Sequence, residues 1–324
     1  MIPTHLSPPY SDDAIKDALF HYTTGDGLHG ILSNKELWST AYFCMNDESE
    51  LKTGRGILAS LFSLKTHDLI EKNDPAVQTI SRRGVDIREY PRNFEDELIG
   101  LALSDLCIYL TCFCIPTTKE DFTHGLLSQW RGYGPDGGYA LQFSRSKLRN
   151  WSDRMYEDHQ LNYDLNDVNY DNENPLKDEI LKHKDTFIQE YLNFLDDIVN
   201  IDFSKTVMPS PLRNLTQGPL ESLLNYITHT KNVHFREERE CRLSFLDLSI
   251  HNKNTRPVHY FNRNGLIVPF VKTPEDSNIL DCVEWIIVGP GTRIDSRFNS
   301  VCHMIKTMGL NIRVRPSHIP YSRA

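Results

Sequence analysis

The chain of 324 residues is long enough for one large domain or two ordinary ones, and 39% of its residues are hydrophobic, enough to bury a core. A peptide module and a chain disordered throughout are therefore excluded. No apolar run approaches the roughly 20 residues that span a bilayer, and the first residues carry neither a basic segment nor an apolar signal core. We expect a cytoplasmic protein that does not enter a membrane.

The net charge of −9 is unevenly distributed. Residues 151–202 carry 14 acidic against 4 basic side chains, whereas the segment from Lys231 to the end carries 14 basic against 9 acidic ones. The C-terminal segment can therefore accept an anionic ligand, although a solvated surface explains the same count. The acidic segment is a candidate surface for a protein partner.

The seven cysteines are scattered and include no CxxC pair and no zinc-finger spacing, which indicates reduced thiols. Cys112 and Cys114 would share one face of a strand. Core packing explains them better than metal binding does, because no further ligands are suitably spaced. The sequence predicts no metal site.

The N-terminal part of the chain predicts a strand, a helix and a second strand. Residues 19–22 form a short apolar and aromatic run that stops at a turn, residues 28–32 carry apolar side chains at helical spacing, and residues 37–43 are again β-prone. Asn46 or Asp47 can then cap a long helix. After it we predict a helix over 94–106, a central strand over 107–114, a turn of helix ending at Trp130 and a strand over 138–143.

The acidic middle has a different pattern. Apolar residues over 180–199 follow the three-four spacing of an amphipathic helix, and Pro219 opens a second helix. We predict a helical insertion over 144–232. Beyond it the pattern predicts a strand over 239–246, a hairpin over 258–271 that turns at Asn264-Gly265, a strand over 285–288, a helix over 296–308 and a last strand over 311–314.

Five short clusters rich in aromatic, polar and charged residues or glycine are spread along the chain. They are residues 21–24 with 28–32, residues 38–40 leading to 45–48, and residues 130–134, 137–141 and 235–243. Together they resemble DUF2971, an uncharacterised bacterial family. The resemblance extends from His21 to residues 316–321, and we expect only the helical middle to lie outside it. That family usually ends its last motif Pro-Tyr-Arg, whereas here Ser322 intervenes before Arg323, so no role is assigned to that arginine.

The same clusters also resemble ADP-ribosyltransferases of the His-Tyr-Glu type, in the order and kind of their elements. In those enzymes a His on the first strand precedes a helix, the second strand carries an aromatic or hydroxyl residue, and a late strand bears the catalytic Glu. Here His21, the strand from Trp38 to Tyr42, and Glu240 occupy these places in order. The resemblance implies a bent sheet and NAD as substrate. A bacterial toxin or phage-defence effector would suit this chemistry by analogy.

The chemistry of NAD cleavage gives an independent reason for such residues. Breaking the nicotinamide–ribose bond passes through an oxocarbenium-like transition state, which a carboxylate such as Glu240 stabilises. A neutral His21 can hold a ribose hydroxyl, and an aromatic ring can stack on nicotinamide. The candidate binding residues are His21, Tyr22, Thr23, Trp38, Ser39, Tyr42 and Arg242.

Along the late strand, alternation places Glu238, Glu240 and Arg242 on one side, so Arg242 is the arginine expected beside Glu240. The Glu238-x-Glu240 spacing is similar to the paired glutamates of arginine-modifying transferases, in which the first carboxylate assists the acceptor. Arg239, Arg242 and Arg131 are the candidates for binding a pyrophosphate.

Each of these assignments has a structural alternative. His21 can be a core histidine, Glu240 can belong to a solvent-facing ladder of Arg and Glu, and Asn46-Asp47 can be a helix cap. Trp130 and Tyr133 can serve packing and a turn. The Gly289-Pro-Gly291 turn lacks the context of a phosphate loop.

The fold that these patterns favour is α+β, a bent mixed sheet with flanking helices and a helical insertion, in one catalytic-type domain over 1–324. The leading hypothesis is an ADP-ribosyltransferase or NAD glycohydrolase, with a protein or nucleic-acid acceptor left open. One alternative is a metal-dependent nuclease that uses Asp47, Glu50 and His21 around Mg²⁺. The other is a non-enzymatic regulatory module that binds a nucleotide.

Overall fold

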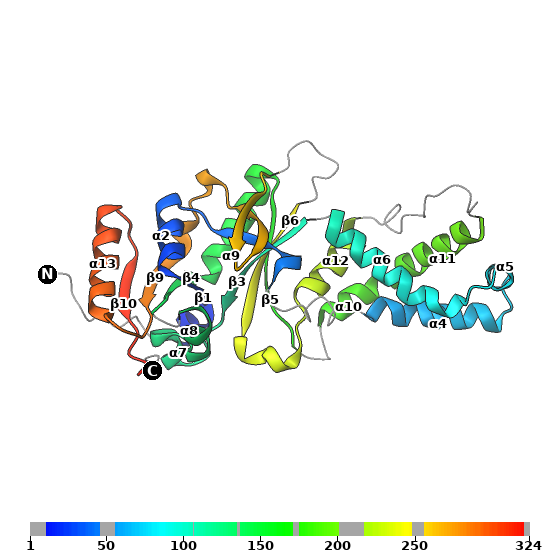
Figure 1. The fold of residues 1–324 in the computed structure, drawn as a ribbon, viewed down its shortest axis with the longest axis horizontal. Coiled ribbons are helices and arrows are strands. Elements are labelled where there is room, and N and C mark those ends of the chain that lie inside the picture. The colour runs from blue at the N-terminus through cyan, green and yellow to red at the C-terminus, as the bar shows by residue number, and fades with distance from the viewer. Residues whose placement is uncertain are drawn as a thin grey trace.

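The structure is a computed structural model that describes residues 11–45, 56–105, 107–134, 137–170, 175–200, 217–247 and 256–320. Within these ranges the chain forms an open sheet of ten strands with flanking helices (Figure 1). The strands are β1 (Ala18–Thr23), β2 (Trp38–Ala41), β3 (Cys107–Cys114), β4 (Tyr139–Ser144), β5 (Asn162–Asp167), β6 (Glu240–Asp247), β7 (His259–Arg263), β8 (Leu266–Lys272), β9 (Val283–Val288) and β10 (Arg313–Pro316).

The sheet is mixed, as predicted. The described strand pairs are antiparallel except β9 with β10, which is parallel. The helices are α1 (Asp12–Asp17), α2 (Gly25–Asn34), α4 (Ile57–Glu71), α5 (Pro75–Arg82), α6 (Tyr90–Asp105), α7 (Lys119–His124), α8 (Leu127–Tyr133), α9 (Arg145–His159), α10 (Pro175–Lys182), α11 (Lys184–Asn200), α12 (Gln217–Thr228) and α13 (Ile294–Thr307). Short 3-10 segments include η1 (Tyr42–Cys44) and η3 (Val233–Glu238). The α+β prediction is confirmed.

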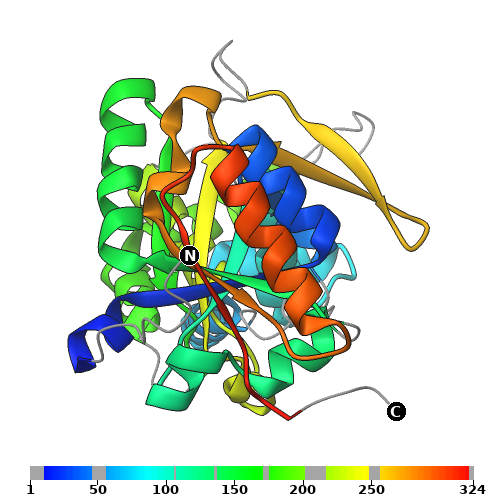
Figure 2. The same cartoon turned by 90° about the vertical axis from the view of Figure 1, so that its left-hand side faces the viewer.

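Alternating side chains on the strands bury both faces of the sheet. On β1, Leu19 packs into the core beneath α2, α9 and α13, whereas Phe20 packs into the core beneath α7 and α8. Figure 2 shows α2 and α13 side by side over one face, and the β7–β8 hairpin projecting away from the body. Local capping fixes the helix starts: the Thr24 side chain accepts from Gly27 N–H at the start of α2.

A separate helical lobe carries a second hydrophobic core (Figure 1). It is built from α4, α5 and α6, which lie between β2 and β3, and from α10, α11 and α12, which lie between β5 and β6. Of the predicted 144–232 insertion, α9 and β5 belong to the sheet body instead. Tyr163 and Leu165 on β5 are buried against the sheet, but two apolar positions within a polar run are too short a pattern to have predicted this strand.

Most other predicted elements are present with shifted ends. The strand, helix, strand opening is β1, α2 and β2, and the predicted hairpin is β7 and β8. The predicted last strand begins two residues later than expected, at Arg313. The predicted cap at Asn46 or Asp47 lies outside the described residues.

The strand that positions the candidate site is β3. One edge of β3 pairs with β6 over its whole length, from Cys107 opposite Asp247 to Cys114 opposite Glu240. A strand has only two edges, so β1 and β2 share the other one. β1 pairs there at Cys114, and β2 pairs at Tyr109 and Leu110. The sheet therefore forks over the intervening residues of β3, into a branch β1-β4-β9-β10 and a branch β2-β8-β7.

Candidate functional site

A cavity of about 210 Å³ lies at this fork. Its walls come from β1, β2, β3, the end of α8, the junction of η3 with β6, and the end of β7. Five of the predicted site residues line it: His21, Tyr22, Trp38, Glu238 and Glu240. These residues are far apart in sequence, and the fork brings them together.

His21 bridges the gap that the fork leaves along β3. Its Nδ1 lies 3.0 Å from the carbonyl oxygen of Cys112. A carbonyl can only accept, so Nδ1 carries the proton and Nε2 is left as an acceptor. Burial lowers the pKa of His21, outweighing the opposing effect of the bond to Cys112, so the ring is neutral at neutral pH. The imidazole can thus accept a hydrogen bond from a ligand hydroxyl.

Two aromatic side chains give the cavity exposed flat surfaces. Trp38 is 41% exposed and stacks on Phe270, with ring centroids 4.2 Å apart. Tyr133, at the end of α8, is 48% exposed. Burial is the main reason that the pKa of Tyr133 is raised to about 12, so its hydroxyl remains protonated. Either ring can pack against a planar ligand group.

Glu240 lies in a buried ion pair at the floor of the cavity. Arg242 donates from Nε to Oε1 at 3.0 Å and from Nη2 to Oε2 at 2.9 Å, and Lys231 Nζ donates to Oε2 at 3.3 Å. Burial alone would raise the pKa of Glu240, but the two cations outweigh it and lower the pKa to about 2. Glu240 is therefore a fixed carboxylate. The predicted neighbour, Arg242, is confirmed, and a solvent-facing ladder is excluded because Glu240 is only 5% exposed.

Glu238 differs from Glu240 in its exposure. Its side chain is 36% exposed and its Oε2 lies 2.7 Å from Lys231 Nζ. The strand itself begins at Glu240, because Arg239 adopts a left-handed backbone conformation (φ 45°) that ends η3. Arg239 points the other way and pairs with Asp121 at 2.7 Å. Lys231 thus links the two glutamates from one side; both line the cavity, and Glu238 is the more exposed to solvent.

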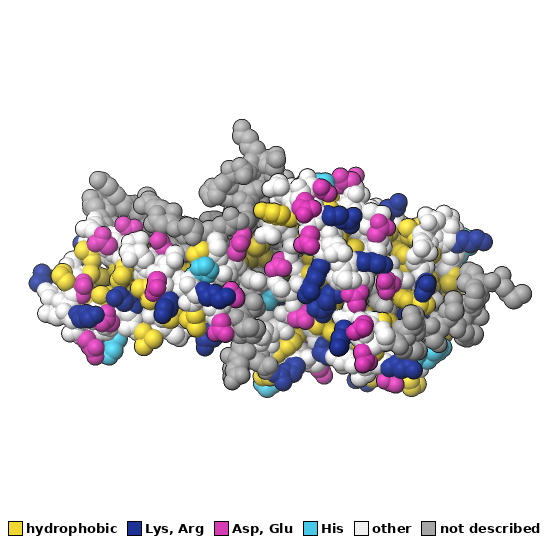
Figure 3. Space-filling view, turned by 180° about the vertical axis from the view of Figure 1, so that it is seen from behind, with side chains coloured by type: hydrophobic (Ala, Val, Ile, Leu, Met, Phe, Trp, Pro, Cys, Tyr) yellow, Lys and Arg dark blue, Asp and Glu magenta, His cyan; other side chains and the backbone are white. Residues whose placement is uncertain are grey.

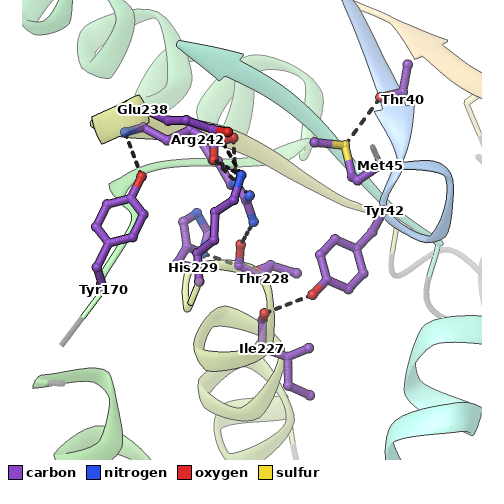
Figure 4. A network of polar contacts seen from close by, with 11 residues as sticks. Thr40, Tyr42, Met45, Tyr170, Ile227, Thr228, His229, Glu238 and Arg242 are labelled. Atoms are coloured by element: carbon purple, nitrogen blue, oxygen red, sulfur yellow. Dashed lines mark hydrogen bonds and ion pairs between the residues drawn. The ribbon is translucent and has the colours of Figure 1, made fainter. Parts of the chain in front are cut away.

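A polar network supports the ion pair from behind (Figure 4). Arg242 is fully buried and its Nη1 donates to the carbonyl of Thr228. The hydroxyl of Tyr170 accepts from the backbone N–H of Glu240 at 3.0 Å. His229, also fully buried, has its pKa lowered to about 4, chiefly by burial and then by the charge of Arg242. These contacts hold the carboxylate of Glu240 in one position.

The other predicted binding residues do not line the cavity. Tyr42 is buried against the helical lobe, where its hydroxyl donates to the carbonyl of Ile227 at 2.9 Å. Ser39 is buried and its hydroxyl lies 2.8 Å from that of Thr111. Thr23 ends β1 beyond the cavity, and Arg242 lies behind Glu240. These residues therefore support the walls of the cavity.

Sequence reasoning did not single out several residues of the site. Lys231 bonds to both glutamates, yet its sequence neighbours gave no signal of this role. Arg263 lines the cavity from the far end of the β7 strand. Gln129 and Thr111 also line it, and both are buried. Only the pairing of β2 with β8 and of β3 with β6 brings these segments to one place, and pairing partners are not readable from a single sequence.

The alternative metal site receives no support from the described residues. Within the described ranges no three His, Cys, Asp or Glu side chains come together as ligands. Asp47 and Glu50, proposed as metal ligands with His21, lie outside those ranges.

The comparisons with known proteins bear on one part of the chain. Residues 129–243 match the model of DUF2971, described as a protein of unknown function. The family resemblance is confirmed for this segment, and the expectation that the helical middle lies outside the family is wrong, because the match includes it. It includes the end of α8, the helices α10 to α12 and both glutamates of the site, whereas His21 and Trp38 lie outside it. Neither a curated protein nor a solved structure matches the chain.

The surface of the helical lobe carries charged side chains of both signs (Figure 3). On the face seen in Figure 3, acidic and basic side chains are interspersed over the lobe.

Among the described helices, none has both the length and the apolar composition needed to cross a bilayer.

Proposed function

We propose that the chain cleaves the nicotinamide–ribose bond of NAD, as an ADP-ribosyltransferase or NAD glycohydrolase. The observation that supports this most is the convergence of His21, Trp38 and the two glutamates on one cavity at the fork of the sheet. A hydroxyl-binding imidazole, an exposed indole and an ionised carboxylate are the three groups that the reaction requires.

The size of the cavity fits one part of the substrate. Pockets for drug-sized ligands measure roughly 300–1,000 Å³. The cavity at the fork, about 210 Å³, is smaller and accommodates the nicotinamide and its ribose rather than the whole dinucleotide. The adenosine end of NAD would extend out of the mouth.

In this proposal Glu240 stabilises the oxocarbenium-like transition state. Its charge persists at neutral pH because its pKa is about 2. Arg242 reduces the field of that charge but fixes both oxygens, and a carboxylate that need not reorient stabilises developing charge without a reorganisation cost. Glu240 lines the cavity, so its carboxylate can face the ribose of a bound substrate.

His21 would hold the ribose, and Trp38 would pack on the nicotinamide ring. The acceptor of a ribose hydroxyl is Nε2 of His21, since Nδ1 is occupied by the Cys112 carbonyl. Glu238 would orient the nucleophile, because it is the more exposed carboxylate. If water attacks the ribose carbon, NAD is hydrolysed. If an acceptor group attacks, ADP-ribose is transferred to it. Nicotinamide is the leaving group in both reactions.

Nicotinamide release from NAD by the purified protein tests the reaction class. We expect release by the wild type, alone or with added cell lysate as a source of acceptor, and no effect of EDTA. Glu238→Gln should slow release, whereas Glu237→Gln, at an exposed position outside the cavity, should not. Cleavage of nucleic acid that EDTA abolishes, without nicotinamide release, would support the metal-dependent nuclease instead. Binding of NAD without release, with or without lysate, would support the regulatory module.

A further inference from the structure

The charges that line the cavity are separated along its length. Glu238 and Glu240 lie at the Cys114 end of β3, where Cys114 pairs with Glu240. Arg263 lies at the other end, where β2 pairs with Leu110 of β3. Four residues of a strand span about 13 Å, so the two carboxylates, whose charges Lys231 and Arg242 neutralise, lie about that far from Arg263. Among the described residues that line it, Arg263 carries the only permanent positive charge.

The hairpin holds Arg263 in place. β7 ends at Arg263, and the following residues Asn264 (φ 52°) and Gly265 (φ 88°) both have positive φ, as a tight two-residue hairpin turn requires. The register pairs Arg263 with Leu266 directly across this turn. An Nη2 donor of Arg263 bonds to the carbonyl of Cys44, at the end of η1. The guanidinium is therefore anchored between the hairpin and the segment that follows β2.

The arginines first considered for a pyrophosphate do not line the cavity. Arg242 is buried behind Glu240, Arg239 pairs with Asp121, and Arg131 is exposed on α8. A guanidinium has five N–H donors, and phosphate oxygens are the acceptors that its planar geometry suits best. The anchoring bond to Cys44 uses one of these donors.

We propose that Arg263 binds a phosphate of the ligand, and that the cavity selects a molecule with a planar ring at one end and a phosphate at the other. Pyridinium nucleotides such as NAD are that class of molecule. The proposal rests on the proposed function for the identity of the ring, but the phosphate contact is a property of binding and does not depend on whether the bond is cleaved.

The test is calorimetric titration with two ligands that the protein cannot cleave. They are carbocyclic NAD and carbocyclic nicotinamide riboside, which lacks the phosphates. Arg263→Gln should weaken binding of carbocyclic NAD about ten- to hundredfold, the usual range for one hydrogen bond to a charged group. Binding of the riboside should change less than threefold. Arg256→Gln is the matched control, because Arg256 also donates from Nη2 to a backbone carbonyl, that of Lys272, but does not line the cavity.

The two proposals fail in different ways. The assignment of Arg263 would be overturned if Arg263→Gln weakened the binding of both ligands equally, or left the affinity for carbocyclic NAD unchanged. Nicotinamide release by the wild type would still support the reaction in that case. Binding that depends on the phosphates, without nicotinamide release, would support the role of Arg263 and overturn the proposed reaction. A wild type that binds neither ligand would overturn both.

Discussion

Buried polar groups have different surroundings and different roles at the fork of the sheet and in the helical lobe. At the fork, a buried carboxylate, a buried guanidinium and a buried ammonium form a connected ion cluster next to a cavity. In the lobe the interior is aromatic and aliphatic, with Phe62, Phe94 and Tyr191 packed ring to ring. The buried carboxylate of Glu95 there accepts the N–H groups of Gly56, Leu58 and Ala59 at the start of α4.

The comparison distinguishes buried polar groups that stabilise the fold from buried polar groups that can bind a ligand. Glu95 satisfies the free N–H groups of a helix start, which is a common structural use of a carboxylate. The ion cluster at the fork satisfies its own charges, and burying it costs more free energy than an apolar core would. Such a cluster beside a cavity is better explained by a ligand than by stability.

The largest expected effect concerns the helical lobe. Phe94→Ala removes a fully buried ring that contacts Phe62, Tyr191 and Phe194, and should lower the free energy of unfolding by about 3–5 kcal/mol. Urea unfolding followed by circular dichroism measures this. At temperatures where the variant is folded, its affinity for carbocyclic NAD should equal that of the wild type. Lost affinity in the folded variant would show that the lobe shapes the cavity.

The second prediction concerns the pH dependence of the ion cluster. The pKa of Glu240 is lowered from 4.5 to about 2, so its ionised form stabilises the fold above about pH 4.5, and this contribution is lost as the pH falls toward 2. The difference in unfolding free energy between the wild type and Glu240→Gln should therefore shrink by about 2 kcal/mol from pH 5 to pH 3.

Urea unfolding at several pH values measures that difference. Glu237→Gln is the control, because an exposed glutamate should change the free energy by less than about 0.5 kcal/mol at any of them. A difference between wild type and Glu240→Gln that is constant with pH would mean that the ion pair with Arg242 does not lower the pKa of Glu240.

The smallest expected effect is on ligand affinity at His21. His21→Phe removes the Nε2 acceptor but keeps a ring of similar shape, and should weaken binding of carbocyclic NAD about three- to tenfold, as the loss of one neutral hydrogen bond implies. Wild-type affinity should be constant from about pH 7.5 to 8.5, because burial lowers the pKa of His21 and the ring stays neutral there. Titrations across this range measure both. Unchanged affinity in the variant would remove His21 from the site.

Much of the sheet could be predicted from the sequence. β3 and β6 are continuous apolar or alternating runs, and Asn264-Gly265 marks the hairpin turn, so local patterns were sufficient. The period-2 alternation also predicted that Arg242 lies beside Glu240. β5 was missed because only Tyr163 and Leu165 mark its buried face.

The rest of the site depends on long-range pairing. Tyr42 was a candidate because it is an aromatic residue of the predicted second strand, but η1 replaces that strand there and turns the ring toward the helical lobe. Lys231 reaches Glu240 only because α12 leads back to β6, and Arg263 reaches the cavity only because the hairpin lies beside β2. Neither arrangement has a local signature, so a single sequence could not predict these two residues.

The most direct test of the central claim is nicotinamide release by Glu240→Gln and by the double variant Glu240→Gln/Arg242→Met. The single variant leaves the buried charge of Arg242 without its carboxylate and should lose about 3–5 kcal/mol of stability. The double variant removes both charges and should regain much of it. If Glu240 is the catalytic carboxylate, release falls about a hundred- to thousandfold in both variants. Recovery of wild-type release in the stable double variant would contradict the claim and make Glu240 a structural residue.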